Sequence, residues 1–129
     1  MPFVYNKVSY LTGGVPALIE IKWSWSGSNQ TETTNFDFPC GLAIEFVTVP
    51  ASSPTSLYDL VVTDAAGTDI LRGMGADRSQ TTAERTTIRD NGIGYPAPFS
   101  GRLTFTISNQ ANGSATGDVY LYVRFPDAR

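Results

Sequence analysis

Three aspartates near the middle of the chain have the side chains and the spacing that could bind a metal ion. Asp59, Asp64 and Asp69 fall five residues apart around Gly67. A hard cation such as Ca²⁺ takes several oxygen ligands. The spacing does not match the calcium loop of helix–loop–helix proteins, and aspartates in tight turns usually hydrogen-bond the nearby backbone. The pattern therefore favours a turn over a calcium site.

Other catalytic chemistries lack the residues they need. Glu20, Glu45 and Glu84 could supply the paired carboxylates of glycoside cleavage, but nothing in the sequence brings two of them together. Cys40 is the single cysteine and the chain has no histidine, which argues against a Cys–His nucleophile pair, a zinc site and an intrachain disulfide. We expect no enzyme activity, no catalytic residues, no metal and no cofactor, with Cys40 a structural thiol.

The segment 57–79 has the clearest local organisation. Its first part alternates, with Tyr58, Leu60 and Val62 on one side, and this predicts a strand. A turn around Gly67 and a short apolar return through 70–71 predict a hairpin. Such a hairpin would hold the loop that follows it rigidly on the surface.

That loop, 72–79, is expected to be cationic and exposed. It carries Arg72, Met74 and Arg78 among glycines, and it lies where the charge of the chain changes sign. Residues 1–71 have a net charge of −5, whereas residues 72–129 have a net charge of +2, with arginine as their only basic residue type. Arginine is preferred in protein interfaces because its planar fork makes bidentate contacts. We therefore expect this loop to contact a partner, although a solvated surface would show the same residues.

Alternating patterns predict an all-β, two-sheet antiparallel sandwich of eight to nine strands, with a jelly-roll or related Greek-key topology. The 129 residues, with 12 Gly and 8 Pro, suit a single domain, 1–129, with short N-terminal and C-terminal arms. Segments 27–34 and 90–98 are predicted to be loops. The strands are expected at 3–11, 17–26, 35–38, 41–49, 58–63, 70–71, 86–88, 101–109 and 118–125.

Charge and hydropathy argue against two classes of partner. The formal net charge is −3, so free nucleic acid is not expected to bind, because phosphate recognition needs clustered Lys and Arg. No stretch approaches 18 apolar residues, so no membrane span is expected. The first residues lack the pattern of a secretory signal, and synthesis in the cytosol is expected.

Aromatic side chains on two strands admit more than one interpretation. Tyr120, Tyr122 and Arg124 alternate with apolar residues and would face outward, either as an interface or as an ordinary β-surface. Trp23 and Trp25 could stack on a sugar. They fall on the same face as neighbouring isoleucines, however, and this favours packing in the core.

Two parts of the chain resemble a family of small proteins from tailed bacteriophages and prophages. Members often show a strand, an Asp/Gly hairpin, a Gly/Ala-rich loop ending in Asn-Arg, and two final strands. This chain has Arg72 and Met74 where small residues are usual, and Asp77 where Asn is usual. The matching segments are 58–64, 67–71, 73–79, 101–109 and 117–124.

The resemblance implies a virion structural protein of the head decoration or cement type. Such a protein is made in the host cytoplasm, binds the major capsid (coat) protein on the outer surface of the shell, and self-associates, here as a dimer or trimer. It implies no catalytic residues. The expected contact residues, from charge and composition, are Phe3, Val4, Tyr5, Arg72, Met74, Arg78, Tyr120, Tyr122 and Arg124.

Two alternatives stay open at this point. One is a tail, baseplate or fibre-adaptor protein, which also needs a rigid β module. The other is a carbohydrate-binding module that uses Trp23, Trp25 or Tyr95. The second alternative requires these aromatic rings to be exposed.

Overall fold

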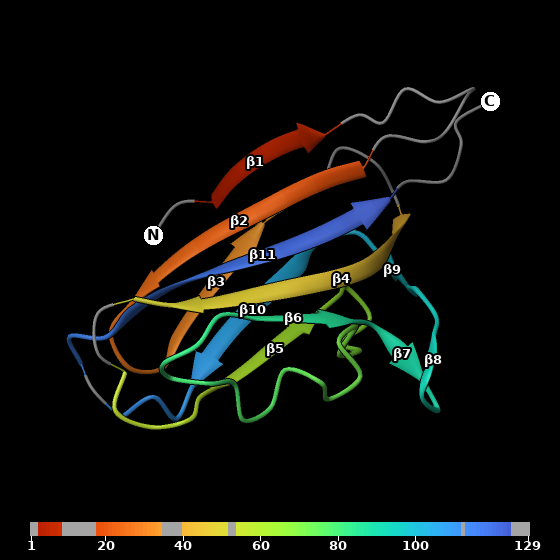
Figure 1. The fold of residues 1–129 in the computed structure, drawn as a ribbon. Helices are drawn as coiled ribbons and strands as arrows, with labels where there is room; N and C mark the ends of the chain where they lie inside the picture. Colours follow the sequence, from red (N-terminus) through yellow and green to blue (C-terminus); the bar gives the residue numbers. More distant parts are fainter. Residues whose placement is uncertain (1–2, 9–17, 35–39, 52–53, 112, 125–129) are drawn as a thin grey trace.

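The computed structural model describes residues 3–8, 18–34, 40–51, 54–111 and 113–124 (Figure 1). Within these ranges the chain forms strands, turns and bends, with no helix. The eleven strands are β1 Phe3–Val8, β2 Leu18–Ser26, β3 Gln30–Thr34, β4 Cys40–Pro50, β5 Asp59–Thr63, β6 Glu84–Thr87, β7 Arg89–Asp90, β8 Ile93–Gly94, β9 Ala97–Ser100, β10 Leu103–Ser108 and β11 Thr116–Arg124.

Two antiparallel sheets face each other, which confirms the predicted all-β sandwich (Figure 1). The large sheet has the order β1-β2-β11-β4-β6, and β9 also pairs with β4. The small sheet has the order β3-β10-β5, and a separate hairpin joins β7 to β8. The jelly-roll version of the sandwich stays a prediction.

The strongest predicted strands form the centre of the large sheet. Along β2, Ile21 and Trp23 are buried and alternate with half-buried polar residues, as the sequence predicts. Strand β11 lies beside β2, with Leu121 opposite Ile21 and Val119 opposite Trp23. The two strands therefore present one continuous apolar surface to the small sheet.

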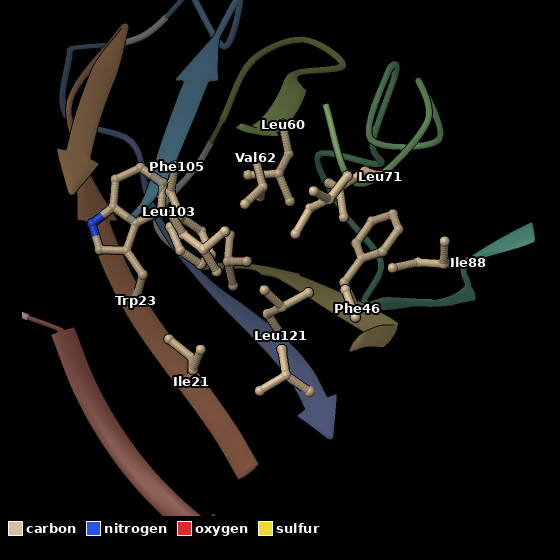
Figure 2. Close-up of a cluster of buried hydrophobic side chains, with 14 of the residues drawn as sticks. Ile21, Trp23, Phe46, Leu60, Val62, Leu71, Ile88, Leu103, Phe105 and Leu121 are labelled. Atoms are coloured by element: carbon tan, nitrogen blue, oxygen red, sulfur yellow. The ribbon is translucent and has the colours of Figure 1, made fainter. Parts of the chain in front are cut away.

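The core is the layer between the two sheets (Figure 2). The Trp23 ring meets the Phe105 ring of the small sheet edge-on, with centroids 5.9 Å apart, and the Trp25 ring packs on Tyr58 at 5.2 Å. Both tryptophans are at most 1 % exposed, so neither ring is available to stack on a sugar. The core interpretation of the two tryptophans is confirmed.

Four strands, β3, β7, β8 and β9, lie where the sequence predicted loops or no strand. Strand β3 is polar throughout and is held at the edge of the small sheet by backbone pairing with β10. The β7–β8 hairpin turns at Asn91 and Gly92, whose φ angles of 52° and 79° lie in the left-handed region typical of two-residue hairpin turns. Strand β9 pairs with the start of β4.

The predicted return strand through Ile70 and Leu71 is wrong. Isolated bridges join Thr63 to Asp69 and Tyr58 to Arg78 at the two ends of β5, and residues 70–77 between them form successive turns. Ile70 and Leu71 are adjacent and both buried, which a strand with one apolar face cannot achieve. The expected strand 35–38 and the C-terminal arm beyond residue 124 lie outside the described residues.

Candidate interaction surfaces

The central aspartates serve the backbone, as the turn interpretation predicts. Asp64 Oδ1 accepts hydrogen bonds from the backbone N–H of Ala66 and of Thr68, at 3.0 and 3.2 Å. Asp69 accepts from Leu71 N–H at 3.0 Å and from the N–H of Gly73 at 2.9 Å. Among the residues that the structure describes, no three His, Cys, Asp or Glu side chains gather in a way that could hold a metal ion.

Glu20 and Glu45 lie in register with Tyr122 on the two strands that flank β11 in the large sheet. The Tyr122 hydroxyl donates a 2.8 Å hydrogen bond to Glu20, while Glu45 forms an ion pair with Arg85. The third carboxylate of the hypothetical glycosidase set, Glu84, accepts from the backbone N–H of Ser79. Each of the three is engaged in a local contact.

These residues belong to a broader surface on the side of the large sheet that faces away from the core. Its centre is the pair of tyrosines on β11, which the sequence correctly places opposite the buried aliphatic residues. Lys22 lies 5.6 Å from the Tyr120 ring, and Arg85 lies 5.6 Å from the Tyr122 ring. We call this surface the tyrosine face; it comprises Glu20, Lys22, Glu45, Val47, Arg85, Tyr120 and Tyr122.

Hydrogen bonds hold Tyr122 and Arg85 of the tyrosine face beside carboxylates. Burial raises the pKa of Tyr122 above its ordinary value, and the hydrogen bond to Glu20 raises it further. The hydrogen bond to Glu45 raises the pKa of Arg85. At neutral pH the tyrosine is therefore an uncharged donor and the arginine is a cation held beside its carboxylate. Exposed ion pairs of this kind contribute little to stability, about 0–1 kcal/mol.

Arg124 and β1 lie at the limits of this surface. Arg124 is exposed at the end of β11, where the register places it opposite Leu18 and Leu42 of the two neighbouring strands. Strand β1 is the outermost strand of the order, so Phe3, Val4 and Tyr5 occupy an edge of the large sheet. An edge strand offers unpaired backbone groups for further pairing.

The structure corrects the expected exposure of Arg78. Its side chain lies inside the protein at 5 % exposure instead of on a presented loop. The guanidinium donates to Thr48 Oγ1 and Thr86 Oγ1, each at 2.9 Å, and lies 4.6 Å from the Phe46 ring centroid. Burial lowers the pKa of Arg78, and the carboxylate of Glu84, 3.6 Å away, partly offsets this. Arg78 therefore joins three segments of the chain and has no surface to offer a partner.

Arg72 and Met74 also turn toward the protein. Arg72 Nη1 donates to the carbonyl of Tyr95 at 2.6 Å and to that of Arg89 at 3.3 Å, with its guanidinium 5.2 Å from the Tyr95 ring. Met74 is half-buried against the core. The loop 72–79 is thus folded along the edge of β5, where Leu60 N–H donates to the Gly75 carbonyl at 2.7 Å.

Burial of Tyr58 makes stability depend on alkaline pH. The pKa of this hydroxyl is raised mainly by burial, against opposing effects of Thr48 and Arg78. The folded state therefore holds the proton more tightly than the unfolded chain, in which the pKa of a tyrosine is about 10. The stabilising contribution is complete below that pH and is lost as pH rises toward the folded pKa.

We expect the free energy of unfolding to fall more steeply from about pH 9 to pH 11 in the wild type than in Tyr58→Phe. Urea unfolding at several pH values measures this difference. The hydroxyl makes no hydrogen bond of normal geometry, so the substitution suits the comparison. Tyr122 is present in both proteins, so its contribution to the pH dependence cancels in the comparison. Parallel pH profiles would contradict the assignment.

The β7–β8 hairpin is a feature that the sequence reasoning assigned to a loop. Ile93 and Tyr95 are 70 % and 55 % exposed there. An Asn-Gly pair between short extended segments is typical of a two-residue hairpin, and Asn91-Gly92 carried that information in the sequence.

In the described part of the chain, no helix is long and apolar enough to cross a membrane. Neither a protein-family model nor a curated protein matches this chain.

Proposed function

We propose that this protein is a non-enzymatic bacteriophage decoration protein that binds the outer surface of a coat-protein shell and stabilises it. The observation that carries the proposal is the tyrosine face. Two half-buried tyrosines lie side by side along β11, each beside a basic group, on the outside of a rigid sheet. Tyrosine and arginine are enriched in interfaces, where rigid aromatic rings bury area at low entropic cost.

The paired charges of this face suit a permanent contact. Because Glu45 neutralises Arg85, a partner that covers the face would not bury an unpaired guanidinium there. Arg124, exposed at the end of β11, is then free to reach a carboxylate on the partner at the polar rim of the contact.

Stabilisation of the shell would follow from selective binding. A protein that binds the expanded shell and not the dissociated or disrupted coat protein stabilises the expanded shell by mass action. The sandwich supplies rigidity, because its two sheets share one tightly packed core. No catalytic step is needed for this role.

Co-sedimentation with purified, expanded empty shells tests the proposal. We expect the wild-type protein to pellet with the shells at low salt and to raise their disruption temperature. The double variant Tyr122→Ser/Arg124→Glu should bind at least about tenfold more weakly, the loss expected for a central interface residue. Its stability should change by about 1 kcal/mol or less, because both side chains lie on the sheet surface.

Arg89→Glu is the matched control, since Arg89 is also an exposed strand arginine but lies in the β7–β8 hairpin, away from the large sheet. It should bind the shells as the wild type does. If the wild-type protein does not bind, or if Tyr122→Ser/Arg124→Glu and Arg89→Glu bind equally, the proposed function or its surface is wrong.

A further inference from the structure

Exposed large apolar side chains fall in two separate places. Among the residues whose burial the structure describes, Ile93 and Tyr95 are 70 % and 55 % exposed on the β7–β8 hairpin. Leu57 and Val61 are 49 % and 38 % exposed before and within β5. The β7–β8 hairpin projects beyond the two sheets (Figure 1), whereas Val61 lies on the small sheet and Leu57 precedes its strand β5. All four side chains are exposed in the same molecule, so the two pairs do not cover each other within it.

The hairpin holds its apolar side chains in a fixed position. Its turn is set by left-handed backbone at Asn91 and Gly92. At its base, Ile88 is fully buried and accepts a 3.0 Å hydrogen bond from Tyr95 N–H through its carbonyl. Arg72 then joins the two sides of the hairpin by donating to the carbonyl of Arg89 in β7 and to that of Tyr95, which follows β8. A rigid contact element loses little conformational entropy when it binds.

One side of the hairpin forms the contact surface, which we call the hairpin tip. Asp90 lies opposite Ile93 in the β7–β8 register, so both side chains leave the ribbon on the same side. Together with Asn91 and Tyr95 they line an open hollow of about 350 Å³. The tip is therefore apolar at its centre, with the Asp90 carboxylate beside it and the Arg72 guanidinium at the Tyr95 ring.

The outer side of the small sheet carries no charged side chain over two adjacent rows. Thr104 lies between Thr33 and Thr63, and Thr106 lies between Thr31 and Val61. An apolar group can cover this surface without burying a charge. We call it the threonine face; it comprises Thr31, Thr33, Val61, Thr63, Thr104 and Thr106.

We propose that the hairpin tip of one molecule packs on the threonine face of a second copy, around Val61. The two exposed apolar sites then cover each other in a head-to-tail contact. Pairing of two tips would leave Val61 in water. Pairing of two threonine faces would leave Ile93 in water. Because the two surfaces differ, the contact repeats from copy to copy and either closes into a ring or continues as a row.

A hairpin tip is small, and this determines the strength of the contact. Its buried area falls at or below the low end of specific protein interfaces, roughly 1,200 Å², so the association is weak and depends on concentration. It becomes effective when other contacts hold copies side by side. The proposal concerns contacts between copies and does not depend on the shell as the partner.

Disulfide trapping with two single-cysteine variants tests the orientation. In a Cys40→Ser background, Ile93→Cys and Val61→Cys are each made in the full chain, and one of them is labelled with ¹⁵N. The two are mixed in equal amounts with oxidised glutathione, which accepts the two electrons and two protons released as each S–S bond forms. Mass spectrometry counts the mixed dimer and the two homodimers.

We expect the ratio of mixed dimer to the two homodimers to exceed the ratio found for the same mixture in urea by at least about tenfold, which corresponds to about 1.4 kcal/mol of preferential contact. Thr87→Cys, at an exposed strand position outside both surfaces, replaces Ile93→Cys as the control and should give the statistical proportion. An excess of the Ile93→Cys homodimer, of the Val61→Cys homodimer, or statistical proportions throughout would overturn the head-to-tail contact. Shell binding could still occur in each of these cases.

Discussion

Replacing Arg78 with alanine is expected to lower the free energy of unfolding by about 3 kcal/mol. The guanidinium satisfies the hydroxyl of fully buried Thr48, together with Thr86 Oγ1 and the carbonyl of Glu84 at 3.1 Å. Its removal leaves these groups without their donor and exposes one face of the Phe46 ring to a cavity. Urea unfolding at neutral pH measures the loss.

Two further substitutions separate the contributions of charge and geometry. Arg78→Lys keeps the cation but not the planar fork, and we expect it to recover less than half of the loss, because one ammonium cannot reach the acceptors on both β4 and β6. Arg72→Lys is the matched control in the same loop, since Arg72 contacts backbone carbonyls at a half-exposed site. A loss of less than about 1 kcal/mol for Arg78→Ala would show that Arg78 is not a structural cation.

Gly75→Ala is expected to destabilise the protein by about 3 kcal/mol or more, or to abolish soluble expression. A Cβ at this position would overlap the carbonyl oxygen of Leu60 and lie 2.9 Å from its carbonyl carbon. Backbone atoms cannot move aside as a flexible side chain can. The substitution would therefore separate loop 72–79 from β5 and break the hydrogen bond from Leu60 N–H to the Gly75 carbonyl.

Gly73→Ala provides the comparison two residues away. A Cβ there meets nothing within 4 Å, but its φ of 80° strains any other residue. We expect a loss of about 1 kcal/mol, the usual conformational cost. Thermal melts of the two variants in parallel distinguish steric overlap from backbone strain. Equal losses would contradict the close approach of Gly75 to β5.

The strands that could be predicted are those whose burial depends on one neighbouring layer. β2, β10 and β11 alternate apolar and polar residues because one face packs on the core and the other does not. β3 could not be found in this way, since Gln30–Thr34 contains no large apolar residue and is held by backbone pairing with β10.

Loop 72–79 was misjudged because burial of a cation depends on distant residues. A run of glycines and arginines is typical of an exposed loop, and no neighbouring residue indicates that Arg78 hydrogen-bonds to side chains of β4 and β6. Those partners are Thr48 and Thr86, which lie 30 and 8 residues away along the chain. The outward orientation of Tyr120 and Tyr122, in contrast, follows from alternation alone.

The most direct test of the proposed function is the number of copies that bind each shell at saturation. The account predicts that the wild-type protein, titrated onto expanded empty shells and counted by quantitative mass spectrometry after sedimentation, saturates in simple proportion to the coat protein. It also predicts that saturated shells resist heat better than bare shells. Saturation at a small fixed number of copies, as for a tail or baseplate adaptor, or no binding at all, would contradict it.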